Sequence, residues 1–404
     1  MQAPGSATSN TARSSKMERF GKGGGMSIRV RPLLAVAVVV TLGAAGCGSF
    51  FQQNHSCTTC TVPSFLFASQ ANTVSGYTLG SSGAPTLAGS QAGPNSSEGI
   101  VVDKSASFLF VSDFQNGTVE AFTINSTSGA LSAVPGSPFS AGPAPGAGGV
   151  AVDPSTRFLY VTQVNSSAVA GFTIAAGTGV LTPIAGSPFP AGNTPMQAIV
   201  DPSGKFLYVS NYNDALGGIS AYTIDSTTGA LTPIAGSPFP TQSNFPGPNR
   251  MAIGGGGQFL YVGMSGTANP NNGVSAFTID PGTGALTQIT GSPFTAGSDP
   301  QGMATDPSGK LLYTANSQDN TLSAFTIDSS AGTLTPASGS PFATSASPLA
   351  LAIDPAGQFL YVGESANNGV EAFSINVTTG SITPITGSPF STGSGVSGLS
   401  SGKP

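Results

Sequence analysis

Histidine, cysteine and charged side chains are scarce in this sequence of 404 residues, which holds one histidine, three cysteines and no tryptophan. The single histidine, His55, lies before the repeats described below. A Ser-His-Asp triad therefore cannot be built within those repeats. The sequence also lacks a GxxxxGKS or GxxxxGKT loop, which argues against a P-loop nucleotide site.

Charged residues make up only 7% of the chain, against roughly a quarter in an average globular protein. The hydrophobic fraction of 39%, arranged in ordered clusters, nevertheless indicates a folded chain. Residues 1–46 contain six basic residues and one acid, whereas residues 47–404 contain six basic and sixteen acidic residues. Because this acidic body has no run of lysine or arginine to meet phosphates, we expect no nucleic acid partner.

The N-terminus is typical of an export signal. Residues 33–45 (LLAVAVVVTLGAA) form an apolar run of thirteen residues, too short for the roughly 20 that cross a bilayer, and basic residues precede it. Small residues then lead to Cys47, as in a bacterial lipoprotein signal. We predict a signal peptide over 1–46, with Met26 as the true start, a lipidated Cys47 and a polar tether over 47–61. The alternative is a plain secretory signal cleaved nearby. Both interpretations place the rest of the chain outside the cytoplasm. The lipoprotein interpretation further predicts a membrane-anchored protein of the periplasm or cell surface, attached to the outer membrane in a cell that has one.

Cys57 and Cys60 form a CTTC pair in the tether, two residues after His55. These three groups are one ligand short of a closed zinc site. In an oxidising compartment a disulfide or two spare thiols is the better interpretation, so we predict no metal here.

One sequence unit recurs seven times at a mean spacing of 49 residues, and this is the strongest signal in the chain. Each unit contains a block such as FLYVSN, a second apolar run such as SAFTI, a turn with glycine, and in six units the segment GSPF. The seven FLYV-type blocks begin at Phe65, Phe108, Phe158, Phe206, Phe259, Leu311 and Phe359.

Each unit is expected to form four short strands separated by turns rich in Gly, Pro, Asp and Asn. The first strand ends in the turn DPSG, as at Asp201 and Asp306, where aspartate, proline and glycine suit the turn backbone. The FLYV block is the second strand, and it is apolar on both faces, as a strand packed between neighbouring sheets must be. The third and fourth strands are the SAFTI and LTPI runs.

Four-stranded units at this spacing predict an all-β fold, a seven-bladed β-propeller of four-stranded antiparallel blades over residues 62–404. The chain enters at the second strand of the first blade, so that blade lacks its first strand. We expect the C-terminal residues 395–403 to supply this strand, which closes the ring and removes exposed edges.

The blocks FLYVSN and YVTQ, together with DPSG and GSPF, resemble the YVTN-repeat and lactonase-like propellers, which include 6-phosphogluconolactonase-like enzymes. The resemblance covers residues 62–404. Enzymes of that family carry a G-P-R-H segment at the start of a first strand, and residues 247–251 read GPNRM here. Arg250 is therefore retained and the histidine is not, although histidine is the usual proton-transfer group near neutral pH.

Function is expected on the rim that carries the irregular loops between second and third strands. Polar residues that begin first strands are predicted at the mouth of the central channel, together with the residues that end second strands. Arg250 would grip an anion or stabilise an oxyanion, and Glu98, Asp113 or Glu364 would activate water. The remaining candidate ligand-binding residues are Asn249, Gln301, Asn211 and Gln197. The ring of second-strand ends is completed by Gln70, Gln163, Met264 and Asn316.

The sequence leaves two functions open. The first is a lipid-anchored binding module of the cell envelope, with a small sugar-like ligand or an envelope polymer or protein as its partner. The alternative is a lactone hydrolase acting on a sugar-acid lactone. We expect a monomer without a cofactor, although Asp113 and Glu364 with neighbouring amides have the oxygen ligands that Ca²⁺ prefers. A weaker third interpretation is a structural protein of the envelope.

Overall fold

A computed structural model describes residues 63–142, 145–214, 218–241, 247–265 and 273–404. The predicted signal peptide, Cys47, Cys57 and Cys60 lie outside these ranges. Contacts divide the chain into two units, Met1–Cys60 and Thr61–Pro404, and the description below concerns the second. Within the described ranges no helix is both long and apolar enough to cross a membrane.

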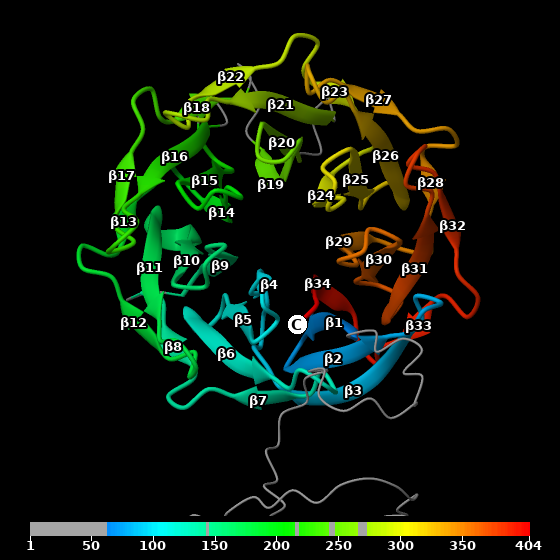
Figure 1. Cartoon of the computed structure of the whole chain (residues 1–404), viewed down its shortest axis with the longest axis horizontal. Coiled ribbons are helices and arrows are strands. Elements are labelled where there is room, and N and C mark those ends of the chain that lie inside the picture. Colours follow the sequence, from blue (N-terminus) through cyan, green and yellow to red (C-terminus); the bar gives the residue numbers. More distant parts are fainter. Residues whose placement is uncertain (1–62, 143–144, 215–217, 242–246, 266–272) are drawn as a thin grey trace, which may run out of the picture. The chain divides into compact units, whose positions relative to one another are not determined.

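Seven antiparallel sheets make up the second unit, and Figure 1 shows them arranged as blades around a common centre. This confirms the predicted seven-bladed propeller. The strands run from the centre outward in chain order within blades 2 to 7. The second strands are almost completely buried because they are packed between neighbouring blades. Because a neighbouring blade covers each face of a second strand, both faces of the FLYV blocks carry apolar residues.

The strand bounds are as follows, from the centre outward, with the short fifth strand last. Blade 1 holds β34 (Val396–Gly402), β1 (Ser64–Gln70), β2 (Thr73–Leu79) and β3 (Pro85–Ala92). Blade 2 holds β4 (Ile100–Val102), β5 (Phe108–Asp113), β6 (Thr118–Ile124), β7 (Leu131–Ala133) and β8 (Phe139–Ser140). Blade 3 holds β9 (Ala147–Val152), β10 (Phe158–Gln163), β11 (Ala168–Ile174), β12 (Leu181–Pro183) and β13 (Phe189–Pro190), with the 3-10 turn η1 (Val164–Ser166) after β10. Blade 4 holds β14 (Pro195–Val200), β15 (Phe206–Asn211), β16 (Gly218–Ile224), β17 (Leu231–Pro233) and β18 (Phe239–Pro240).

The remaining three blades repeat this order. Blade 5 holds β19 (Pro248–Gly254), β20 (Phe259–Met264), β21 (Gly273–Ile279), β22 (Leu286–Gln288) and β23 (Phe294–Thr295). Blade 6 holds β24 (Pro300–Thr305), β25 (Leu311–Asn316), β26 (Thr321–Ile327), β27 (Leu334–Pro336) and β28 (Phe342–Ala343). Blade 7 holds β29 (Pro348–Ile353), β30 (Phe359–Glu364), β31 (Gly369–Ile375), β32 (Ile382–Pro384) and β33 (Phe390–Ser391).

The C-terminal strand closes the ring as predicted. β34 pairs with β1 in antiparallel register, with Phe65 opposite Gly402 and Ala68 opposite Leu399. In Figure 1 this red strand lies beside the blue strands of blade 1. β34 also contacts the innermost strands of blades 2 and 7, so the first strands form an unbroken circle. Without β34, the inner edge of β1 would be exposed.

The GSPF segments produce a short fifth strand that the sequence analysis did not predict. In blade 4, Gly236 has a φ of 88°, a conformation that suits glycine. Ser237 Oγ then accepts a hydrogen bond of 2.9 Å from the amide of Ala221. Phe239 and Pro240 pair with the start of β16. The serine thus supplies an acceptor to the third strand where the outer strand is interrupted.

The repeated aspartate of the DPSG turn is structural, as expected. In blade 4, Oδ1 of Asp201 accepts the amides of Lys205 and Phe206 at 2.8 and 2.7 Å, and Oδ2 accepts the amide of Ser203 at 2.9 Å. The carboxylate therefore binds the turn backbone directly. Blade 5 replaces this turn with glycines at 255–257, all with positive φ.

Tyrosines of the second strands join neighbouring blades. The hydroxyl of Tyr208 in blade 4 donates a hydrogen bond of 2.9 Å to the carbonyl of Gly284 in blade 5. Four further tyrosines make the same contact with the next blade along the ring. The full set is Tyr160–Gly229, Tyr208–Gly284, Tyr261–Gly332, Tyr313–Gly380 and Tyr361–Gly83. Blades 1 and 2 carry Phe67 and Phe110 at this position and have no such hydroxyl.

Candidate functional site

A cavity of about 110 Å³ lies where the innermost strands converge. All seven blades contribute to its wall, mostly through glycine, alanine, valine, leucine and isoleucine. Four larger polar side chains, Glu98, Gln197, Arg250 and Gln301, lie where first strands begin. Small and aliphatic residues thus form most of the wall, and the four polar side chains lie at one rim of the channel. The wall consists of Glu98, Gly99, Ile100, Gly149, Val150, Gln197, Arg250, Gln301, Gly302, Met303, Leu349, Ala350, Leu351, Ser397, Gly398 and Leu399.

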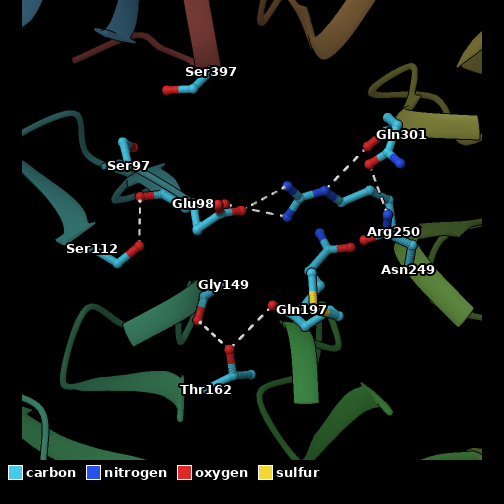
Figure 2. Close-up of polar contacts among 12 residues, drawn as sticks. Ser97, Glu98, Ser112, Gly149, Thr162, Gln197, Asn249, Arg250, Gln301 and Ser397 are labelled. Atoms are coloured by element: carbon cyan, nitrogen blue, oxygen red, sulfur yellow. Dashed lines mark hydrogen bonds and ion pairs between the residues drawn. The ribbon is translucent and has the colours of Figure 1, made fainter. Parts of the chain in front are cut away.

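Arg250 crosses this mouth from blade 5 to blade 2, as Figure 2 shows. Its Nη2 lies 3.9 Å from Oε2 of Glu98, and Nη1 donates a hydrogen bond of 3.3 Å to the Glu98 carbonyl. Nε donates to the carbonyl of Gln301 at 3.1 Å. The separation of 3.9 Å exceeds hydrogen-bond length, so Nη2 keeps donors that a bound anion could use.

Burial and the charge of Glu98 have opposite effects on the pKa of Arg250. The Arg250 side chain is 20% exposed and that of Glu98 is 37% exposed. Burial lowers the pKa of Arg250, and the negative charge of Glu98 raises it. Since arginine stays protonated in proteins, the mouth holds a positive charge in a partly desolvated place, where it attracts an anion more strongly than in water.

Blade 4 holds the backbone of Arg250 on both sides. Ser210 Oγ donates a hydrogen bond of 2.6 Å to the carbonyl of Asn249, the residue before the arginine. Gln197 Oε1 accepts the amide of Met251, the residue after it. The amide of Gln197 in turn donates to Ser210 Oγ at 3.2 Å. Gln197 and Ser210 thus form a clamp on β19, and we call this pair the blade 4 clamp.

Asn249 holds the arginine from the other side. Its Nδ2 donates to Oε1 of Gln301 at 2.8 Å, and Nε2 of Gln301 donates to Oδ1 of Asp299 at 2.8 Å. Asn249 is 3% exposed, yet its Oδ1 has no hydrogen-bond donor among the described residues. A buried acceptor without a donor is costly, so this oxygen is a candidate partner for a ligand hydroxyl.

The structure separates the predicted site residues into two groups. Glu98, Gln197, Arg250 and Gln301 line the cavity, and Asn249 adjoins them. Asp113, Asn211 and Glu364 do not line it. They lie at the ends of second strands, which are one strand farther from the centre than the strands that line the channel. Each of the three residues is at most 2% exposed. The sequence places the second-strand ends at the mouth, whereas the structure buries them within their blades.

Most polar groups of this second set hold nearby backbone. Glu364 Oε1 accepts the amides of Ser345 and Ala346 at 3.0 and 3.1 Å, in the segment that leads to β29. Asp113 Oδ2 accepts the amide of Asn95, in the segment that leads to β4, at 3.3 Å. Asn211 Nδ2 donates to the carbonyl of Gly218 at 3.1 Å. Gln70 and Gln163 contact the equivalent connecting segments, through Thr392, Ser394 and Ala141.

Two blades carry a pair of carboxylates where the others do not. Asp113 adjoins Glu120 in blade 2, and Glu364 adjoins Glu371 in blade 7. Burial, followed by the charge of Asp113, raises the pKa of Glu120 to about 7. Burial is also the main cause that raises the pKa of Glu364, and the charge of Glu371 adds to it. Like charges so close disfavour double ionisation.

The calcium interpretation required Asp113 and Glu364 to share a site. The structure puts them in different blades, each engaged with backbone amides. Within the part of the chain that the structure describes, no three His, Cys, Asp or Glu side chains are grouped to hold a metal ion. The polar groups at the mouth are one carboxylate, two amides and a guanidinium, which suit a polar organic anion better than a cation.

Neither Ser210 nor the clamping role of Gln197 was predicted from the sequence. Ser69 and Ser112 precede the last residue of their second strands as Ser210 does, so the sequence alone did not single out Ser210. The residue at the same position in blade 3, Thr162, likewise bonds the next blade, at the Met196 carbonyl 3.1 Å away. The recurring Ser or Thr at this position was therefore the available signal.

Comparison with known proteins agrees with the observed fold. The family model described as lactonase, seven-bladed β-propeller, matches residues 56–343. No curated protein matches with significance. Similar solved structures include a putative 6-phosphogluconolactonase from Bacteroides fragilis, at 18% identity and a TM-score of 0.71, covering 85% of this chain and 99% of that one.

Two more structures share the fold. One is a putative 6-phosphogluconolactonase from Bacteroides uniformis, at 17% identity and a TM-score of 0.72, covering 84% of this chain and all of that one. The other is the periplasmic gluconolactonase PpgL of Pseudomonas aeruginosa, at 17% identity and a TM-score of 0.66, covering 83% and 98%. At these identities the structures support the fold, and the family model covers well over half of the chain. The chain belongs to the lactonase family of seven-bladed β-propellers.

Proposed function

We propose that the protein hydrolyses a sugar-acid lactone at the channel mouth, with Arg250 and Glu98 as its catalytic residues. The observation that carries this is the juxtaposition of a mostly buried guanidinium with spare donors and a partly exposed carboxylate 3.9 Å away. The family supports lactone chemistry, and its gluconolactonase neighbours support a sugar acid. Since the cavity measures about 110 Å³, the sugar ring would rest at the mouth rather than inside the channel.

The reaction needs one base and one anion-stabilising group. Glu98 takes a proton from water as the water oxygen adds to the lactone carbonyl carbon. The carbonyl oxygen becomes an oxyanion, which the Nη2 donors of Arg250 stabilise. When the tetrahedral intermediate collapses, the bond from the carbonyl carbon to the ring oxygen breaks, and the proton held by Glu98 passes to that oxygen. The product is the open hydroxy acid.

Asn249 and Gln301 orient the sugar in this scheme. The unpartnered Oδ1 of Asn249 accepts a hydroxyl of the ligand, and the hydrogen bond from Asn249 Nδ2 to Gln301 fixes the orientation of the amide. A polyhydroxylated substrate satisfies such groups, whereas an apolar one leaves them unpaired. We therefore expect selectivity for sugar lactones over alkyl lactones.

The experiment is a lactone hydrolysis assay with δ-gluconolactone and 6-phosphogluconolactone. We expect turnover above the uncatalysed rate, lowered by roughly 10²–10³-fold in Arg250→Ala, as when an oxyanion donor is removed. Arg157→Gln serves as the matched control, because that arginine lies in blade 3 outside the channel wall. Activity that survives Arg250→Ala would remove the proposed site.

A second function uses the same mouth without turnover. The residues of the repeats contain no histidine, which favours a binding module at the cell envelope. In this proposal the chain is exported, anchored through a lipidated Cys47, monomeric, and binds a small sugar-like ligand or an envelope polymer or protein. Saturable binding of gluconate with no lactone turnover would favour it over the hydrolase.

A further inference from the structure

A second cavity lies on the opposite rim, between blades 2 and 3. It measures about 490 Å³, within the range of 300–1,000 Å³ typical of small-ligand pockets. Its floor contains Phe108, Ile124 and Ile174, and hydroxyls and one arginine surround them. The wall residues are Ser105, Ser107, Thr123, Ser155, Thr156, Arg157, Ala176 and Gly177. We call this cavity the blade 2–3 groove. None of its residues lines the central channel.

The seven repeats act as an internal control for this groove. At the turn between first and second strands, blades 4 to 7 have a glycine with positive φ at 204, 257, 309 and 357. Blade 2 has Ala106 and blade 3 has Thr156 there, with φ values of 48° and 57°. A β-branched residue in this region is a strained exception. Its hydroxyl reaches across to Oδ2 of Asp103 in blade 2, at 3.2 Å.

A second departure removes a polar cap. The turn between third and fourth strands begins with Asp or Asn in blades 2, 4, 5, 6 and 7. In blade 4, Asp225 Oδ1 accepts the amides of Thr227 and Thr228 at 3.0 and 2.8 Å. Blade 3 has Ala175 instead, directly before the groove residues Ala176 and Gly177. The groove thereby lacks an acceptor that the other five turns provide.

A third feature is an arginine, Arg157, at the turn position where blades 4 and 6 carry a lysine. Arg157 is exposed, its guanidinium carbon lies 5.0 Å above the ring of Phe158, and Nε donates to Ser155 Oγ at 3.0 Å. No hydrogen bond among the described residues uses its Nη groups. The nearby Asp103 and Asp153 carboxylates already accept several turn amides and hydroxyls, at Ser105, Ser107, Phe108, Ser155, Arg157 and Phe158.

We propose that the blade 2–3 groove binds a hexuronic acid, with its carboxylate on Arg157 and its ring over the apolar floor. The free Arg157 donors, the hydroxyl of Thr156 and the turn without an aspartate cap meet at this one cavity. A cation, a row of hydroxyls and an apolar floor match the carboxylate, the hydroxyls and the C–H face of such a sugar. The sugar comes either free or as a unit of an acidic polysaccharide.

Isothermal titration tests this with D-galacturonate, trigalacturonate and, as neutral control, D-galactose. We expect saturable galacturonate binding, weakened at least tenfold in Arg157→Gln and unchanged within about twofold in Lys205→Gln, the same turn position in blade 4. Ala175→Asp restores the cap found in the other blades, so it should fold and yet weaken binding by repulsion. Arg250→Ala should leave this binding intact, which separates it from the channel site.

The two sources are distinguished by the trisaccharide. Trigalacturonate that binds at least tenfold more tightly than the monosaccharide identifies a polymer as the ligand, and equal affinity identifies the free sugar. Equal binding of galactose, unchanged binding by Arg157→Gln, or no saturation by either acidic probe would overturn the proposal.

Discussion

Arg250 in blade 5 and Glu98 in blade 2 face each other across the channel, with 3.9 Å between Nη2 and Oε2. They are 152 residues apart in sequence, and the ring brings them together because both lie where first strands begin. Neither residue can reach the other unless the blades surround a common centre. The candidate chemistry therefore depends on the closure of the ring and on the contacts that hold the start of β19.

The blade 4 clamp should set the position of Arg250. Ser210→Ala removes the hydroxyl that binds the Asn249 carbonyl, so we expect kcat/KM for lactone hydrolysis to fall about tenfold, since small misplacements are costly in catalysis. Ser210→Thr keeps the hydroxyl and should recover most of the loss. Ser388→Ala is the control, because Ser388 Oγ accepts the amide of Ala372 within blade 7 and lies outside the channel wall. An equal loss in both alanine variants would mean that the hydroxyl only stabilises the fold.

The tyrosine contacts between blades should contribute measurably to stability. Tyr361→Phe leaves the buried carbonyl of Gly83 without its donor, so we expect the free energy of unfolding to fall by about 1–2 kcal/mol. Tyr208→Phe should cost about the same, since its contact with Gly284 has equal geometry. Urea unfolding followed by circular dichroism measures both. Variants as stable as the parent would show that these hydroxyls are not needed between blades.

Removal of the C-terminal strand should prevent a stable ring. Deletion of 396–404 takes away β34 and exposes the inner edge of β1, so we expect aggregation and loss of the cooperative thermal transition. Deletion of 403–404 alone should have little effect, because β34 ends at Gly402. Size-exclusion chromatography and a thermal melt compare the two. A monomeric longer deletion with the parent melting temperature contradicts closure by this strand.

The carboxylate pair of blade 2 should make stability depend on pH. The pKa of Glu120 is raised from its ordinary value of 4.5 to about 7, first by burial and then by the charge of Asp113. The native state thus binds the proton more tightly than the unfolded chain does. This contribution is complete below pH 4.5 and is lost as the pH rises through 7.

Glu120→Gln removes that dependence. The full pKa shift would correspond to roughly 3 kcal/mol at 1.36 kcal/mol per pKa unit. Because solvent screens the partly exposed carboxylate, we expect the free energy of unfolding to rise by about 1 kcal/mol at pH 8. At pH 4 the variant and the parent should be equally stable. Urea titrations at both pH values check this, and a variant less stable than the parent at pH 8 excludes the proposed cause.

The sequence was sufficient for the architecture because each blade repeats the same local pattern. Within a repeat, the FLYV block can only be a buried strand and DPSG can only be a turn. The first blade lacks one strand, and β34 lies within the range 395–403 predicted to supply it. The short strands after GSPF were not foreseen, since two residues such as Phe239 and Pro240 carry no periodicity.

The candidate site was only partly accessible from sequence. Residues at first-strand starts, such as Glu98 and Arg250, reach the channel because the innermost strands face it. The ends of second strands lie on the same rim as the starts of first strands. Their side chains, however, are directed toward the connecting segments, as at Glu364. The radial position of a side chain depends on which neighbouring blade it meets, and periodicity within one repeat does not contain that information.

The most direct test of the channel mouth as the ligand site is a crystal structure of the protein soaked with D-gluconate, the product of gluconolactone hydrolysis. We expect the gluconate carboxylate on Nη2 of Arg250, with a hydroxyl donating to Oδ1 of Asn249 and the sugar chain between Glu98 and Gln197. Gluconate bound elsewhere while the mouth stays empty would contradict it.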